Sequence, residues 1–164
     1  MVDESTGIPR DPAVLGPLLM RGASTIRQAE AAERLVVQVP ELRDWLINNQ
    51  FIELYQGKRK PYARTKFKEA ADRACEILRN GYSALEESGL SMSCWSVLEV
   101  SANLSGEVKG TLRDVNELED EHAKLVGEAV LYAFGFFDAT VDVNGGWGEE
   151  MGPNAADYDR RFGE

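Results

Sequence analysis

Residues 115–136 read VNELEDEHAKLVGEAVLYAFGF and contain the strongest periodicity in the chain. Positions of one face recur at alternating intervals of three and four residues: Val115, Leu118, His122, Leu125, Ala129, Tyr132 and Phe136. This spacing, sustained for about three repeats, is typical of a heptad seam. The stretch therefore predicts a long helix that packs against other helices of the bundle or against a partner.

Apolar residues recur at helical spacing in four earlier segments as well. The expected helices run from Thr25 to just before Pro40, from Pro40 to Gly57, from Thr65 to Glu87, and from Ser91 or Ser93 to about Val108. A capping box of Thr25 with Gln28 would start the first of them. Gly106 and Gly110 predict a kink or break at the end of the last. We find no useful run with the two-residue period of a strand, so the predicted fold is all-α, a bundle of about five helices.

The 164 residues fit one domain flanked by two Gly- and Pro-rich ends. We expect an extended N-terminal arm at 1–23, a helical bundle at 24–143 and an extended C-terminal arm at 144–164. Apolar residues of the arms and of the seam are the predicted protein interfaces. They are Leu15, Leu18, Leu19, Leu118, Leu125, Tyr132, Phe136, Trp147, Met151, Tyr158 and Phe162.

The composition is that of a globular protein with a net charge of -10. This charge disfavours general binding to nucleic acid or to an anionic membrane, because phosphates repel it. The first residues lack the basic start and apolar core of a signal peptide, and no apolar run approaches the ~20 residues of a membrane span. Two cysteines without a CxxC pair favour free, buried thiols. We therefore expect a cytoplasmic or virion protein.

A basic segment at 57–68, GKRKPYARTKFK, stands out from this acidic background. Its six cations are Lys58, Arg59, Lys60, Arg64, Lys66 and Lys68, and without them the rest of the chain carries -16. The segment either contacts phosphate or an acidic partner, with Tyr62 available to stack on a base, or is a solvated turn that balances the remaining charge. Direct contact with nucleic acid is expected only here, if anywhere. The spacing of its glycine excludes a P-loop.

Acidic residues crowd the last two predicted helices and suggest an alternative metal site. Helical nucleotide pyrophosphohydrolases hold magnesium on carboxylates from two helices, and the run from Glu117 to Asp120 supplies only the second part of their pattern. The ligands to test are Glu107, Glu117, Asp120 and Glu128. The alternative is a solvated helix face. His122 follows Glu119 at the spacing of a di-iron motif, but it is the only histidine, and a hydrogen-bonded structural role in the seam is the preferred interpretation.

No catalytic nucleophile is indicated, because no serine lies in a GxSxG motif and neither cysteine lies near a base in the sequence. The preferred hypothesis is a non-enzymatic structural or assembly subunit without a cofactor, such as a virion neck or shell component or a small accessory subunit. Its partners would be other protein subunits or a second copy. The alternatives are a magnesium-dependent all-α nucleotide pyrophosphohydrolase and an acidic regulator that mimics nucleic acid.

Overall fold

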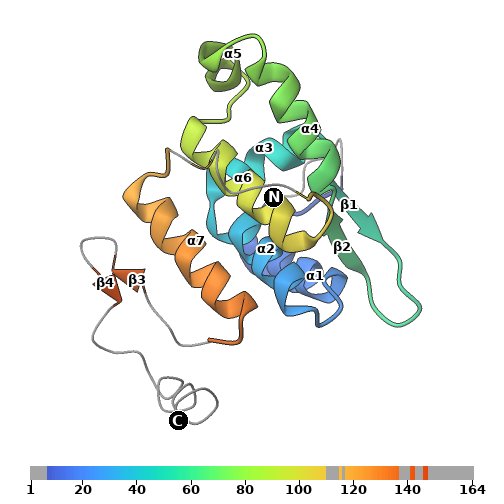
Figure 1. Cartoon of the computed structure of the whole chain (residues 1–164). Helices are drawn as coiled ribbons and strands as arrows, with labels where there is room; N and C mark the ends of the chain where they lie inside the picture. Colours follow the sequence, from blue (N-terminus) through green and yellow to red (C-terminus); the bar gives the residue numbers. More distant parts are fainter. Residues whose placement is uncertain (1–6, 110–114, 116, 137–140, 143–145, 148–164) are drawn as a thin grey trace.

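The computed structural model describes residues 7–109, 115, 117–136, 141–142 and 146–147. These residues are mostly helical (Figure 1). In chain order the elements are α1 (Pro12–Gly22), α2 (Arg27–Gln38), α3 (Pro40–Asn48), β1 (Ile52–Tyr55), β2 (Tyr62–Thr65), α4 (Phe67–Leu78), α5 (Tyr82–Glu87), α6 (Met92–Ser105), α7 (Asp120–Ala133), β3 (Val141–Asp142) and β4 (Gly146–Trp147). The strands β1 and β2 form one antiparallel pair, and β3 and β4 form another.

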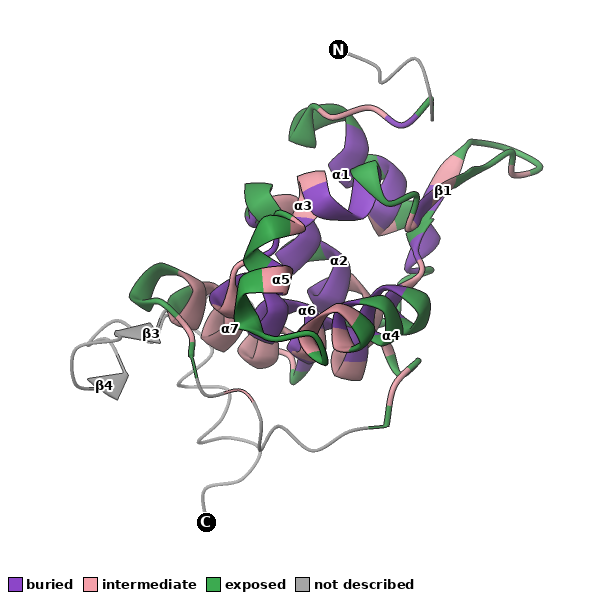
Figure 2. Ribbon diagram, turned by 90° about the horizontal axis from the view of Figure 1, so that it is seen from above, coloured by how far each residue is buried: buried purple, intermediate pink, exposed green. Residues whose placement is uncertain are grey.

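The core is built around α6, which packs against α2, α4 and α7. Most of the α6 residues are buried, including small ones such as Ser96, Ser101 and Ala102. A helix that is buried nearly all round lies in the interior of a fold rather than on its surface. The buried residues drawn in purple accordingly concentrate on α1, α2, α3 and α6 (Figure 2).

Residues 12–22 form a helix, so the prediction of an extended N-terminal arm was wrong for this segment. The Asp11 side chain accepts a hydrogen bond from Ala13 N at 2.9 Å, and Pro12 occupies the first helical position. Leu15 and Leu19 are fully buried in the core. Burial of these two side chains outweighs the helix-breaking tendency of Gly16 and Pro17, because each buried leucine contributes about 1.5–3 kcal/mol.

Residues 52–65 form a β-hairpin, whereas the sequence analysis predicted a helix through Tyr55 and no strand. Gln50 adopts a left-handed backbone with φ 60°, which stops α3 and turns the chain into β1. Ile52 pairs with Thr65 and Tyr55 with Tyr62. These β-branched and aromatic residues favour strands, but the cross-strand pairing that selects the strand joins residues up to 13 positions apart.

Of the other predicted helix boundaries, some are confirmed and some are wrong. The predicted cap at Thr25 is wrong, since Thr25 has φ 65° and α2 begins without a side-chain cap. The predicted helix over 65–87 ends at Leu78 and restarts at Tyr82 after Gly81, whose φ is 102°. Ser91 does cap α6, and Gly106 ends it in the left-handed conformation, so the expected break is confirmed there.

Candidate functional site

The tip of the β1–β2 hairpin carries a run of exposed cations. Lys58, Arg59 and Lys60 are all exposed, and among the described residues none of them has a hydrogen bond or ion pair. The rings of Tyr55 and Tyr62 stack below the tip with centroids 5.1 Å apart. The tip is thus a small basic patch on the surface of an otherwise acidic protein.

The other three cations of the basic segment are held by the chain itself. Lys66 forms an ion pair with Glu53, and Lys68 with Asp72 at 2.7 Å. Arg64 donates from Nε to Gly22 O at 3.2 Å, and its guanidinium group lies 5.5 Å from the centre of the Tyr62 ring. The predicted basic patch therefore divides into a free tip and a base tied to the fold.

The base of the hairpin is fixed against α1 and α2. Arg21 donates from Nε to Pro61 O at 2.8 Å, which ties the end of α1 to the hairpin loop. Gly22 lies so close to β2 that a Cβ atom there would be 1.8 Å from Ala63 O. These contacts hold the base of the hairpin, from which the tip projects.

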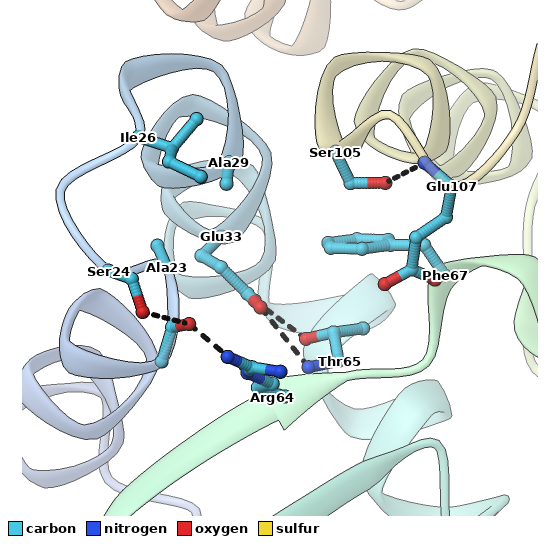
Figure 3. A pocket seen from close by; sticks show the side chains of 11 residues that line it. Ala23, Ser24, Ile26, Ala29, Glu33, Arg64, Thr65, Phe67, Ser105 and Glu107 are labelled. Atoms are coloured by element: carbon cyan, nitrogen blue, oxygen red, sulfur yellow. Dashed lines mark hydrogen bonds between the residues drawn. The ribbon is translucent and has the colours of Figure 1, made fainter.

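A pocket of about 180 Å³ lies beside the base of the hairpin, between the α1–α2 turn, α2, the start of α4 and the end of α6 (Figure 3). Its apolar lining includes Ile26, Ala29 and Phe67. Glu33 supplies a carboxyl group from α2, and Glu107 supplies one from the turn after α6. The Glu33 carboxyl points toward Thr65 (Figure 3), whereas Glu107 Oε2 accepts from Lys68 N at the start of α4. The pocket thus combines apolar side chains with two acidic groups and the guanidinium group of Arg64.

Glu33 is a buried acid with only 5% of its surface exposed. Its Oε1 accepts from Thr65 N at 3.1 Å and its Oε2 from Thr65 Oγ1 at 2.6 Å. Burial raises the pKa of Glu33 to about 7, and the nearby charge of Glu107 acts in the same direction, while the bonds from Thr65 oppose the shift. Glu33 therefore changes protonation near neutral pH.

The three predicted N-terminal interface anchors lie in the protein's own core. Leu15 and Leu19 are completely buried, and Leu18 is 9% exposed. These side chains cannot contact a partner while α1 stays folded on the core. The interface role predicted for them is replaced by an internal packing role.

Seam residues also pack internally. Leu118, Leu125 and Tyr132 are partly buried against the core. The Tyr132 hydroxyl donates to Glu30 Oε2 at 2.6 Å, and the Arg34 guanidinium lies 4.2 Å from the centre of its ring. Phe136 is half-buried just beyond α7. The helix itself begins only at Asp120, so the first two predicted seam positions precede it.

The predicted C-terminal anchors lie beyond what the structure describes. Met151, Tyr158 and Phe162 fall outside the described residues, and only the backbone of Trp147 is described, within β4.

Of the four acidic residues of the magnesium alternative, Glu107 lies apart from Glu117 and Asp120. The start of α7 is held against the start of α6 through a hydrogen bond from Glu119 N to Ser93 Oγ. Glu107 follows the opposite end of α6, so about 20 Å of helix separates it from Glu117 and Asp120. No cluster of three or more metal-ligating side chains occurs in the described part of the chain.

His122 is hydrogen-bonded within the fold, as expected for a structural histidine. Its Nδ1 lies 2.6 Å from Ser93 Oγ, and Ser93 is 3% exposed. Ser93 also receives the Glu119 N–H at the start of α7. This buried serine joins α6 to α7.

Glu33 and the pocket were not predicted from the sequence. Glu33 lies in a helix whose polar residues are mostly exposed, and nothing in the local pattern marks it as buried. Its burial depends on Thr65, 32 positions away. The hairpin had a usable signal, since strand-favouring residues flank the polar GKRKP loop on both sides.

No helix in the described ranges is long and apolar enough to cross a membrane. In comparisons with known proteins, no family model, curated protein or solved structure matches this chain.

Proposed function

We propose that this protein is a non-enzymatic subunit that docks onto an acidic surface of another protein through the tip of its β1–β2 hairpin. The observation that carries this function is the state of the tip: Lys58, Arg59 and Lys60 are exposed and unpaired within the described residues. Arg64 and Lys66, which follow a few residues later in the chain, are engaged internally. Three unpaired cations at the end of a hairpin favour electrostatic docking.

The fixed hairpin base favours specific docking over a merely solvated turn. Arg21, Arg64 and Glu33 connect the hairpin to α1 and α2 through hydrogen bonds. A surface held in place before binding loses less conformational entropy on association. The stacked rings of Tyr55 and Tyr62 add rigid aromatic area of the kind that is enriched at interfaces.

An acidic protein surface fits the charge distribution better than nucleic acid does. A polyanion that extended beyond the tip would lie against the rest of the protein, whose net charge without the six cations of the basic segment is -16. Repulsion between that charge and a line of phosphates opposes binding over more than a few ångströms. A local acidic patch on a partner engages the tip without this penalty. Trp147, Met151, Tyr158 and Phe162 remain proposed anchors for the same partner.

The test compares proteins captured from native cells by the tagged wild-type chain and by a charge-reversed chain carrying Lys58→Glu, Arg59→Glu and Lys60→Glu. The control carries Arg73→Glu, Arg79→Glu and Lys124→Glu, which make the same change in net charge at exposed positions elsewhere. We expect a discrete set of proteins to be retained by wild type and control, lost by the tip variant, and insensitive to nuclease. Equal retention by all three chains, or loss on nuclease treatment, contradicts the proposed function.

A further inference from the structure

The pocket beside the hairpin base has two carboxyl groups with acceptor sites that the described chain does not fill. A carboxylate offers about four lone-pair positions. Glu33 accepts two hydrogen bonds, both from Thr65, and Glu107 accepts one, from Lys68 N at 3.1 Å. Neither forms a salt bridge with any described residue. The nearby Arg64 is engaged by Gly22 O and the Tyr62 ring.

Apolar side chains supply another part of the pocket lining, and the pocket is partly open. Phe67 is buried, Ala29 is partly exposed, and Ile26 is 57% exposed at the rim. An isoleucine that is this exposed next to a cavity gains by being covered. The volume of about 180 Å³ accommodates a small organic molecule of a few heavy atoms, since one water occupies about 30 Å³ of liquid.

The turn at the rim is held in an uncommon backbone conformation. Ser24, which lines the pocket, and Thr25, which follows it, have φ values of 55° and 65°. Two consecutive non-glycine residues in the left-handed region cost about 1–3 kcal/mol each and are concentrated at functional sites such as ligand clamps. The strain thus falls at the same place as the buried acid and the open apolar wall.

From these observations we infer that the pocket binds a small alkylammonium ion. The ammonium group lies between the carboxylates of Glu33 and Glu107, and the alkyl chain lies against Phe67, Ala29 and Ile26. Charge-assisted hydrogen bonds to two carboxylates select a cation over a neutral or anionic molecule of the same length. Binding here is independent of docking by the hairpin tip, because none of the three tip cations lines the pocket.

The experiment titrates n-butylammonium chloride into the ¹⁵N-labelled full chain and follows the backbone amides by NMR. Thr65 and Lys68 are the reporters, because their N–H groups donate to Glu33 and Glu107. We expect saturable shifts with a dissociation constant of about 1 mM or lower. Butanol and sodium butyrate are the neutral and anionic controls, and neither should shift these amides saturably.

Three variants assign the binding to the pocket. Glu107→Gln, at an exposed position, should weaken butylammonium binding about tenfold while the chain stays folded. Ala29→Leu fills the cavity without changing its charge and should abolish binding. Glu86→Gln, an exposed change in α5, should leave affinity unchanged. Absence of saturable shifts in the wild type, equal binding of butyrate, or undiminished binding by Ala29→Leu overturns the inference.

Discussion

Glu33 holds a largely buried carboxyl group between α2 and the end of the hairpin. Its pKa of about 7 lies above the ordinary value of 4.5 because burial disfavours the charged form. Between these two pH values the folded protein keeps a proton on Glu33 that the unfolded chain has lost. The contribution of Glu33 to the free energy of unfolding therefore falls as pH rises from about 4.5 to about 7, and is constant above.

Replacing Glu33 by glutamine should remove this dependence. Between pH 4.5 and pH 8, the free energy of unfolding of the wild type should fall by on the order of 3 kcal/mol relative to that of Glu33→Gln. The reason is that each pKa unit between the folded and unfolded values corresponds to about 1.4 kcal/mol. Urea unfolding of both proteins at several pH values in this range measures the difference. A stability difference that is the same at every pH contradicts a raised pKa for Glu33.

Gly22 sets the distance between α1 and the hairpin. A Cβ atom at Gly22 would be 1.8 Å from Ala63 O, a backbone atom that cannot rotate away. Gly22→Ala should therefore destabilise the fold by about 1–3 kcal/mol or more. The control is Gly16→Ala in the same helix, where the nearest atom outside its chain neighbours is Val37 Cγ1 at 3.6 Å, so the change should cost less than Gly22→Ala. Thermal unfolding should show a clearly larger loss of stability for Gly22→Ala, and equal shifts contradict the close approach.

At the scale of elements, α6 shows what local sequence was able to predict. Ser91 at its start and Gly106 at its end are strong local signals, and both bounds follow them. The hairpin was missed although strand-favouring residues flank its loop, and its place in the fold depends on a distant contact from Thr65 to Glu33. The helix α1 was missed because its stability depends on the packing of Leu15 in the core. The local sequence pattern does not indicate contacts with residues far away in the chain. The same limit applies to the pocket, which joins α2, α4 and the end of α6.

The connection between α6 and α7 depends on Ser93. Ser93→Ala would leave the Glu119 N–H and His122 Nδ1 without their partner, at a cost of about 1–3 kcal/mol. Ser101→Ala is the matched control, a buried serine of the same helix that bonds only to Val97 O, and it should cost less than about 1 kcal/mol. Chemical denaturation measures both changes. Equal losses would show that Ser93 contributes nothing particular to the α6–α7 contact.

At the scale of the whole molecule, charge is distributed unevenly. The hairpin tip lies at one side of the protein, and the acidic start of α7, with Glu119, Asp120 and Glu121, lies at the other (Figure 1). The net charge of -10 makes copies of the chain repel one another. The α1 leucines and much of the seam are meanwhile covered by the chain itself.

We therefore expect a monomer in solution. Light scattering behind gel filtration at moderate salt should give a mass near 18.2 kDa. A stable dimer would contradict this expectation and would make a second copy of the chain the partner at the seam.

The proposed docking role is tested most directly by photo-crosslinking at the hairpin tip. A photo-reactive amino acid replaces Gln56, an exposed neutral residue beside the three tip cations, so their charges are kept. The control places the same amino acid at Ser83, an exposed position in α5 away from the hairpin (Figure 1). Irradiation in native cells should join the Gln56 variant to a specific protein and leave the Ser83 variant uncrosslinked. Crosslinking only from Ser83, or from Gln56 to nucleic acid alone, would contradict docking of the tip onto an acidic protein.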